Sequence, residues 1–292
     1  MTVTAGSLSW GRRFLMCPPE HFAVLYEINP WMHREVQVDL EAARSQWEGL
    51  VATLEAAGAA IEVLEPHPGL PDLVFTANAG TLNGRRFVPS RFRHPERRGE
   101  VAHYVEWFTA HGWSVTPLAE PPVPAGGAHE GAGDALPFGT GFLSGYRFRS
   151  DAAAHVELSR LLGAEVRPIE LVDPRLYHFD LTFCPLDAGR AMVAPDAWDR
   201  YGRTVVEAVV GELLVLESDE AAAFCANSVV VGTTVVMPAC PIRVGRRLEA
   251  WGFDVVVADV GEFLKAGGGC RCLTLALDVE VGGVGSGAGL EG

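Results

Sequence analysis

The sequence predicts an α/β protein built from repeated units, and two series of residues support this prediction. Amphipathic helical stretches repeatedly end at a glycine and are followed by a short apolar strand. A second series places a polar residue, or in the last case a cysteine, before each predicted pair of strands. Both series recur at intervals of roughly 40 to 55 residues, and an internal period of this size indicates a repeat architecture.

The glycine series marks where the predicted helices end. Its members are Gly58, Gly112, Gly163, Gly211 and Gly252. The first helical stretch has the periodicity of an amphipathic helix, because its apolar residues recur on one face. These residues are Leu40, Ala43, Trp47, Leu50, Val51 and Leu54. An apolar run after the glycine, such as AAIEVL or FDVVVAD, is typical of a strand that follows a helix.

The polar series predicts where a site would form. Its members are Asn29, Asn78, Asp134, Asp180, Asn227 and Cys272. If the repeats close into a ring, equivalent residues face one central axis and form a concave polar site. A doubly wound sheet is the alternative, since alternating strands and helices also suit that fold. Neither common Gly-rich phosphate loop occurs in the sequence to support it.

The composition favours a folded protein with a small cationic ligand. The 292 residues are 48% hydrophobic, which is ample for a buried core. The net charge of -14 repels phosphate backbones and anionic lipids, so nucleic acid and membrane surfaces are unfavourable partners. The sequence leaves homo-oligomerisation open.

Location and domain organisation follow from the ends of the chain and from its cysteines. The segment MTVTAGSLSWGRRFLMCPP has no apolar stretch long enough for a signal peptide, and nothing approaches a membrane span. Six cysteines are too few for a disulfide scaffold in a chain of this length, so we expect a cytoplasmic protein. Residues 1–280 are expected to form a single catalytic domain, and residues 281–292 a flexible Gly-rich tail.

The segment GGGCRCLT contains the candidate nucleophile. Cys272 and Cys270 follow three glycines, which allow the backbone to approach a ligand closely. A structural zinc site needs four ligands in spaced pairs, and this pair has no matching histidine cluster, so no metal is expected. The thiolate form of a cysteine is the nucleophile.

Two further motifs supply a base and carboxylates. In YHFDLTFC, His178 lies two residues before Asp180, so the two side chains share a face if the segment is a strand. Histidine is the usual proton shuttle for a thiol nucleophile. In HEGAGD, Glu130 and Asp134 lie among glycines before an apolar strand, where an unpaired carboxylate is costly. A carboxylate there can orient the histidine or bind a guanidinium.

The motifs FTANAG, HEGAGD, YHFDLTFC and GGGCRCLT, in this order, resemble those of the guanidino-group-modifying superfamily. That superfamily includes arginine deiminase, dimethylarginine dimethylaminohydrolase, arginine dihydrolase and amidinotransferases, and the motifs cover most of the chain. The resemblance implies a five-bladed α/β propeller with pseudo-fivefold ββαβ repeats, in agreement with the internal period. It also implies chemistry at a guanidino carbon through a covalent thiouronium intermediate, without cofactor or metal.

The resemblance also implies roles for individual residues. The catalytic residues are Cys272 as nucleophile, His178 as general acid and base, and Glu130 as the carboxylate beside it. The family spacing, in which two residues separate the Gly-rich run from the cysteine, excludes Cys270. The substrate-binding residues are Asn29, Asn78, Asp180, Arg97, Arg149 and the carbonyl of Ala266. Arg97 and Arg149 would bind the α-carboxylate of the substrate, with Arg93, Arg98 and Arg147 left open.

Two departures from the family pattern affect the expected activity. HEGAGD has one residue more between its acids than the common EGGD, which leaves the role of Asp134 open. Asn78 stands where deiminases and many methylarginine hydrolases have an aspartate, and a neutral amide offers no bidentate carboxylate to a guanidinium. Arginine dihydrolases share this asparagine and the early segment that contributes Asn29. We therefore expect arginine dihydrolase, with dimethylargininase, an amidinotransferase and a non-catalytic arginine-binding module as alternatives.

Overall fold

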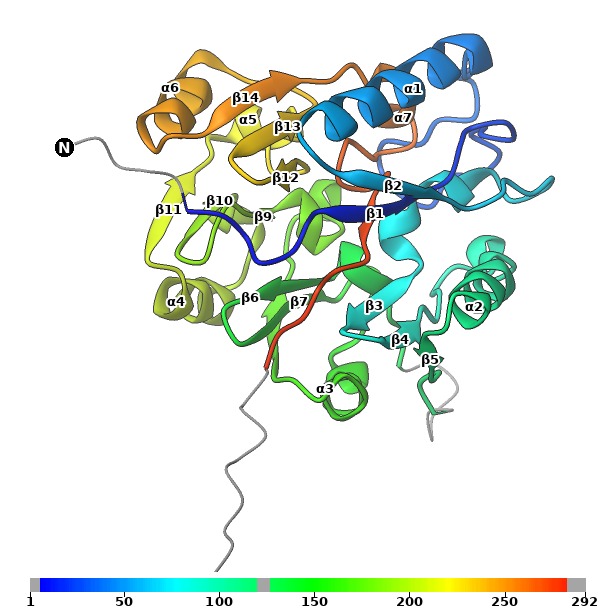
Figure 1. The fold of residues 1–292 in the computed structure, drawn as a ribbon, viewed down its shortest axis with the longest axis horizontal. Helices are drawn as coiled ribbons and strands as arrows, with labels where there is room; N and C mark the ends of the chain where they lie inside the picture. The colour runs from blue at the N-terminus through cyan, green and yellow to red at the C-terminus, as the bar shows by residue number, and fades with distance from the viewer. Residues whose placement is uncertain (1–5, 120–126, 283–292) are drawn as a thin grey trace, which may run out of the picture.

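A computed structural model describes residues 6–119 and 127–282, and within them the chain forms five three-stranded sheets (Figure 1). The strands are β1 (Arg13–Met16), β2 (Ala60–Val63), β3 (Gly80–Asn83), β4 (Arg86–Pro89), β5 (Ser114–Val115), β6 (Ala135–Phe138), β7 (Gly141–Tyr146), β8 (Val166–Glu170), β9 (Phe183–Pro185), β10 (Arg190–Val193), β11 (Glu212–Val215), β12 (Val229–Val231), β13 (Thr234–Met237), β14 (Asp254–Val257) and β15 (Leu275–Ala276). The α-helices are α1 (Leu40–Ala56), α2 (Glu100–Ala110), α3 (His155–Leu162), α4 (Arg200–Val209), α5 (Ser218–Ala222), α6 (Ile242–Ala250) and α7 (Gly261–Leu264). The predicted mixed α/β class is confirmed.

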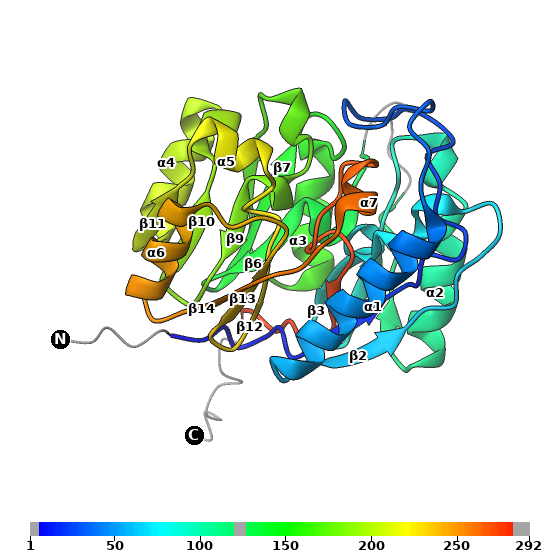
Figure 2. The ribbon, with the colours of Figure 1, turned by 90° about the horizontal axis from the view of Figure 1, so that it is seen from above.

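The five sheets share one connectivity. In each, the middle strand pairs antiparallel with one neighbour and parallel with the other, as in the sheets β3-β4-β5 and β6-β7-β8. A helix connects the middle strand to its parallel neighbour, and these helices are α1, α2, α3, α4 and α6. In the sheet β15-β1-β2, the first described strand pairs with the last one and with β2. Figure 2 shows α4 and α6 on one flank of the molecule and α1 and α2 on the other, with strands between them.

Four of the five predicted glycines end a helix in the left-handed conformation. The positive φ angles of Gly58, Gly112, Gly163 and Gly252 lie between 66° and 98°. Gly211 is the exception, because the residue that follows α4 is Val210, whose φ and ψ of −101° and 124° are extended. The chain therefore leaves α4 directly into β11 and needs no left-handed residue.

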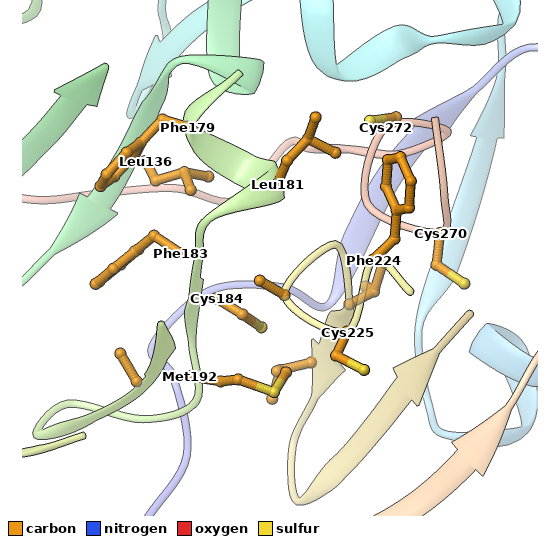
Figure 3. Packing of buried hydrophobic residues seen from close by; sticks show 14 of the residues in the cluster. Leu136, Phe179, Leu181, Phe183, Cys184, Met192, Phe224, Cys225, Cys270 and Cys272 are labelled. Atoms are coloured by element: carbon orange, nitrogen blue, oxygen red, sulfur yellow. The ribbon is translucent and has the colours of Figure 1, made fainter. Parts of the chain in front are cut away.

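The first helix largely has the predicted buried face. Ala43, Leu50 and Leu54 are buried in the core, whereas Leu40 is 47% exposed. The Asp39 side chain caps the helix by accepting hydrogen bonds from two first-turn amides. The core extends beneath the sheets through stacked aromatic and aliphatic side chains, some of which Figure 3 shows.

Five of the six members of the polar series lie before a strand as predicted, whereas Asn29 lies between β1 and the helix α1. Asn78, Asp134, Asp180, Asn227 and Cys272 each precede the first strand of a hairpin-like pair or, for the last, the terminal strand β15. Several of them belong to short 3₁₀ turns that lead into the strand. Because these turns meet in the interior, residues far apart in sequence become neighbours.

The predicted tail begins within the described residues. Val281 donates through its amide to the Asn83 side chain at 2.8 Å and accepts from it at 3.0 Å. Residues 283–292 lie outside the part of the chain that the structure describes. Over residues 6–119 and 127–282, no helix combines the length and apolar character needed to cross a bilayer.

Replacing Phe14 by alanine tests the sheet that joins the two ends of the chain. Phe14 is fully buried and pairs with Ala276 and Ile61 on the two neighbouring strands. The cavity left behind should lower the free energy of unfolding by about 3–5 kcal/mol, measured by urea denaturation. Leu25→Ala is the control, because Leu25 is 57% exposed and should change it by less than about 0.5 kcal/mol. Equal effects of the two changes would contradict this account of the sheet.

Candidate active site

A pocket of about 280 Å³ gathers most of the predicted site residues. Its lining consists of Ile28, Asn29, Asp72, Phe75, Asn78, Arg97, Arg149, Tyr177, His178, Ala266, Gly268 and Cys272. Glu130 and Asp180 do not line it, but both lie directly behind residues that do. The structure thus brings all nine predicted residues to one place.

A larger hollow of about 480 Å³ lies beside Trp31 and Asp173. Its described lining residues include neither a cysteine nor a histidine. Its carboxylate Asp173 is paired with Arg175 at 2.7 Å. The smaller pocket is therefore the candidate active site, because it alone of the two holds a nucleophile and a proton donor.

The Cys272 thiol is held by a ring of polar groups. The Asn227 side chain donates to the sulfur at 3.2 Å and accepts from the amides of Gly269 and Cys272 at 3.0 and 3.3 Å. The thiol donates to Asp180 Oδ2 at 3.4 Å. Burial, and then the neighbouring Asp180, raise the pKa of Cys272 well above its ordinary value. Burial also raises the pKa of Asp180 to about 6. The thiol is therefore protonated at neutral pH in this environment.

The geometry separates the two cysteines of the motif. Cys272 lines the pocket, whereas Cys270 is fully buried and does not. Figure 3 shows their sulfur atoms pointing away from one another. Burial raises the pKa of Cys270 far above its ordinary value, and an inert buried thiol is the result.

The glycine run before the thiol is required by close contacts. Gly267 has a φ of +80°, and its carbonyl accepts a hydrogen bond from the Tyr177 hydroxyl at 2.9 Å. A Cβ atom on Gly269 would lie 2.9 Å from Asn227 Oδ1. The backbone groups that we expected to face a ligand are thus used by Tyr177 and Asn227.

His178 lies between two carboxylates. Its Nδ1 is 3.1 Å from Asp134 Oδ1, and its Nε2 is 3.4 Å from Glu130 Oε2. Burial alone would lower the pKa of His178, but Asp134 and Glu130 outweigh burial and raise it to about 9. The imidazole is therefore protonated at neutral pH, which suits a proton donor. The sequence left the role of Asp134 open, and the structure places its carboxylate against the His178 imidazole.

The predicted strand around His178 is wrong. His178 is extended, but Asp180 belongs to a 3₁₀ turn that covers Phe179–Leu181. Asp134 Oδ1 accepts the Phe179 amide at 3.1 Å, which satisfies a donor at the start of that turn. His178 and Asp180 consequently reach different groups: the first contacts Glu130 and Asp134, and the second contacts the Cys272 thiol.

Glu130 is a fully buried carboxylate that keeps its charge. Arg149 Nη1 donates to its Oε2 at 2.8 Å, and the Arg93 amide donates to its Oε1 at 3.2 Å. Burial would raise the pKa of Glu130, but Arg149 and His178 together hold it below its usual range. A charged Glu130 in turn favours the protonated form of His178.

Asn78 is fixed at both ends of its amide. Its Nδ2 donates to the Glu130 carbonyl at 2.9 Å, and its Oδ1 accepts from Arg97 Nη1 at 2.9 Å. Arg97 also donates twice to Glu100, with both distances 2.8 Å. The predicted role of Arg97 in binding a substrate carboxylate therefore disagrees with its geometry, because its fork is already occupied. Its contacts make it a group that positions Asn78.

The other arginine candidates are also engaged. Arg149 lines the pocket, with its guanidinium 4.7 Å from the Tyr177 ring centroid and one donor on the Ile28 carbonyl at 3.0 Å. The three arginines left open lie outside the pocket lining: Arg93 pairs with Asp151, Arg147 with Glu170, and Arg98 donates to the Phe92 and Arg93 carbonyls. Arg149 therefore remains the better placed candidate for a substrate carboxylate.

Asn29 and Ala266 contact each other across the pocket. The Asn29 Nδ2 donates to the Ala266 carbonyl at 3.0 Å, and its Oδ1 accepts the Trp31 amide at 2.9 Å. A carbonyl oxygen has a second lone pair, so Ala266 keeps one acceptor position. The early loop and the segment before the nucleophile are thereby joined.

Three residues of the site were given no role by the sequence reasoning. Asn227 belongs to the polar series, and its membership was the signal that it would reach the thiol. Tyr177 precedes His178 in the same motif and carries a hydroxyl that fixes the glycine run. Asp72 lines the pocket and accepts from the Tyr26 hydroxyl at 3.0 Å, but nothing in its local sequence distinguishes it from a surface acid.

Among the described residues, no group of three or more histidine, cysteine, aspartate or glutamate side chains is arranged to bind a metal ion.

A model of the eukaryotic N,N dimethylarginine dimethylhydrolase family matches residues 26–279. The chain belongs to this family. The predicted membership of the guanidino-modifying superfamily is therefore confirmed.

Relatives within this family carry two activities. The chain is 39% identical to N(G),N(G)-dimethylarginine dimethylaminohydrolase of Mycobacterium tuberculosis, over 91% of this chain and 86% of that protein. It is 41% identical to the bifunctional arginine dihydrolase/ornithine cyclodeaminase AgrE of Nostoc, over 92% of this chain but only 38% of AgrE. It also matches the substrate-bound N-terminal domain of ArgZ, a cyanobacterial arginine dihydrolase, with a TM-score of 0.86 and 38% identity over 92% of this chain and 99% of that domain.

The pKa of His178 predicts a pH dependence of stability for this family member. A folded-state pKa of about 9, above the ordinary 6.5, stabilises the fold fully below pH 6.5 and loses that contribution as the pH rises through about 9. The difference in free energy of unfolding between wild type and His178→Gln should therefore shrink from pH 6 to pH 10 in urea denaturation. A constant difference would show that His178 titrates at its ordinary pKa.

Proposed function

We propose that this protein is a cysteine-dependent hydrolase of the guanidino group of L-arginine or an Nω-methylated arginine, with arginine dihydrolase favoured. The observation that carries the proposal is the placement of the Cys272 thiol and the His178 imidazole on one small pocket. Nucleophile, proton donor and orienting carboxylate are the parts that covalent catalysis at such a carbon needs. The family relatives are hydrolases of arginine or dimethylarginine.

The charge of the substrate would activate the nucleophile. The pKa of the Cys272 thiol is raised by burial, so the thiol is protonated and donates a hydrogen bond to Asp180. A guanidinium next to the sulfur lowers the pKa of the thiol, because an adjacent cation stabilises the thiolate. Asp180, with one carboxylate oxygen free of hydrogen-bond partners, is placed to receive the proton or to bind a guanidino N–H. Substrate binding and formation of the Cys272 thiolate are therefore coupled, because the bound guanidinium lowers the pKa of the thiol.

The first cycle converts arginine to citrulline. The Cys272 thiolate attacks the guanidino carbon, and the C–N bond to the leaving amine breaks as His178 donates its proton. The S-alkylthiouronium that remains is attacked by water, which His178, now neutral, deprotonates. The thiol is regenerated, and one water has replaced one ammonia.

A second cycle would convert citrulline to ornithine. The thiolate attacks the ureido carbon and expels the remaining ammonia, and water then releases a carbamate that loses carbon dioxide to leave ornithine. The neutral amide of Asn78 favours this step, because a neutral ureido group needs no carboxylate partner in a buried site. Its position is firm, with Arg97 and the Glu130 carbonyl on its two ends. An ArgZ variant with an asparagine replaced by serine is covalently bound to a reaction intermediate.

Dimethylargininase is the second candidate. The similarity to the mycobacterial dimethylarginine dimethylaminohydrolase, which covers 86% of that protein, favours it. The same nucleophile and proton donor would then expel dimethylamine after a single cycle. An amidinotransferase would use the same intermediate with an amine in place of water.

A five-bladed propeller about a pseudo-fivefold axis is the architecture that we propose for the five sheets. Their common connectivity and the convergence of the polar series support it. A single catalytic domain in a reducing cytoplasm agrees with six cysteines that are all free.

Serine replacements test the nucleophile. Cys272→Ser should reduce turnover of arginine by several orders of magnitude, because a hydroxyl is a far weaker nucleophile than a thiolate in this setting. Cys270→Ser is the matched control and should keep most of the activity, since Cys270 does not reach the pocket. Turnover is measured as ammonia release, and trapped adducts by intact-mass spectrometry. Loss of activity in Cys270→Ser but not in Cys272→Ser would show that Cys270, and not Cys272, is the nucleophile.

The products test which hydrolase this is. Arginine, citrulline and dimethylarginine are supplied separately, and ornithine, citrulline and dimethylamine are resolved by chromatography. Ornithine from both arginine and citrulline is expected. Dimethylamine release without ornithine would refute the dihydrolase proposal and support the second candidate.

Asn78→Asp should lower the ratio of ornithine to citrulline from arginine by about tenfold to a hundredfold, because a carboxylate in this buried position suits a guanidinium and not the neutral ureido group of citrulline. Asn78→Ser is the control that removes the amide without adding a charge. An unchanged ratio in both variants would show that Asn78 does not select the product.

A further inference from the structure

A second cavity lies on the other side of the segment that carries the nucleophile. It has a volume of about 230 Å³ and lies among residues of the strands β3, β6 and β15. Arg271 lines it, while the next residue, Cys272, lines the substrate pocket. The two cavities share no lining residue. They are therefore separate spaces on either side of adjacent residues.

Arg271 lines this cavity and makes no direct ion pair within the described part of the chain. The residue is 4% exposed, and its Nε is buried without an acceptor. Among the described residues its guanidinium has no ion pair and no hydrogen bond, and it faces the Trp10 ring, whose centroid lies 5.2 Å from Cζ. Asp180 attracts the guanidinium from beyond ion-pair distance. Arginine stays protonated in proteins, so a cation without a directly bound counter-ion is buried here. Such a charge is costly unless an anion accompanies it.

The walls of the cavity define what kind of anion fits. Of its described lining residues, Arg271 is the one that carries a charge, and most of the others are apolar, such as Leu82, Phe142 and Val279. The hydroxyl of Thr81, also in the lining, is already shared with His129 at 2.9 Å. One cation and few free donors suit an ion of a single negative charge. A phosphate or sulfate would leave further charge unpaired in apolar surroundings.

We propose that this cavity binds a small monovalent anion, such as chloride or formate, through the guanidinium of Arg271. The bound anion lies behind the nucleophile and outside the substrate pocket. Arg271 and Cys272 adjoin in sequence, and the cation acts on both the Cys272 sulfur and the Asp180 carboxylate. An anion that neutralises Arg271 weakens its attraction for the thiolate. Anion binding therefore slows reactions of the Cys272 thiolate.

Chloride binding to the purified full chain is measured by ³⁵Cl NMR line broadening at fixed ionic strength, with gluconate as the replacing anion. Saturable broadening is expected for wild type. It should be lost in Arg271→Met, which keeps a long apolar side chain, and kept in Arg160→Met, whose arginine side chain is 70% exposed. Equal chloride affinity in all three proteins would overturn the proposal. Competitive displacement of chloride by formate would extend the site to carboxylates, whereas displacement by sulfate at equal affinity would contradict the selectivity for a single charge.

Two further readouts keep the test decisive if Arg271→Met does not fold. Crystals of the wild type grown in bromide should give an anomalous peak beside the Arg271 guanidinium, and a cavity empty of bromide would refute the site. Alkylation of Cys272 by iodoacetamide, followed by mass spectrometry, should be slower in chloride than in gluconate. An alkylation rate independent of chloride would refute the coupling to the thiol. None of these measurements requires turnover of arginine, so they stand independently of the proposed function.

Discussion

The buried ion pair between Arg149 and Glu130 is the interaction on which the rest of the site depends. Glu130 is fully buried, and burial alone would raise its pKa, but Arg149 is the first of the charges that lower it. With the pair intact, Glu130 and Asp134 together hold His178 as an imidazolium. The same arginine donates to the Ile28 carbonyl and so attaches the early loop to the pocket. One pair of charges thereby sets both the proton content and the shape of the site.

Much of the fold could be read from the sequence because its signals are local. A left-handed glycine after a helix is a backbone requirement, and four of the five predicted positions adopt it. Gly211 does not, since Val210 ends α4 in an extended conformation that no single-residue signal reveals. The segment from His178 to Asp180 was misread for a tertiary reason: a side chain from another repeat, Asp134, stabilises a turn there.

The site was predictable where motif and repeat coincide, as for Cys272 and Asp180. Its geometry was less accessible, because the partner of a buried charge lies elsewhere in the chain. Arg97 is of a residue type that binds carboxylates, so it was predicted to bind the substrate. In the folded protein its guanidinium donates two hydrogen bonds to Glu100 instead. Asn227 belongs to the polar series, but its hydrogen bond to the thiol forms only because two turns, 45 positions apart in the chain, meet in the folded protein.

The sheet β15-β1-β2 has a consequence for synthesis. Gly11 donates its amide to the Asp278 side chain, and these residues are 267 positions apart in the chain. A ribosome adds on the order of ten residues per second, so β1 exists for tens of seconds before β15 is made. During that time its apolar residues Phe14 and Leu15, both fully buried in the finished fold, lack one of their two neighbouring strands. Strand β1 therefore leaves the ribosome long before the strand that completes its sheet is made.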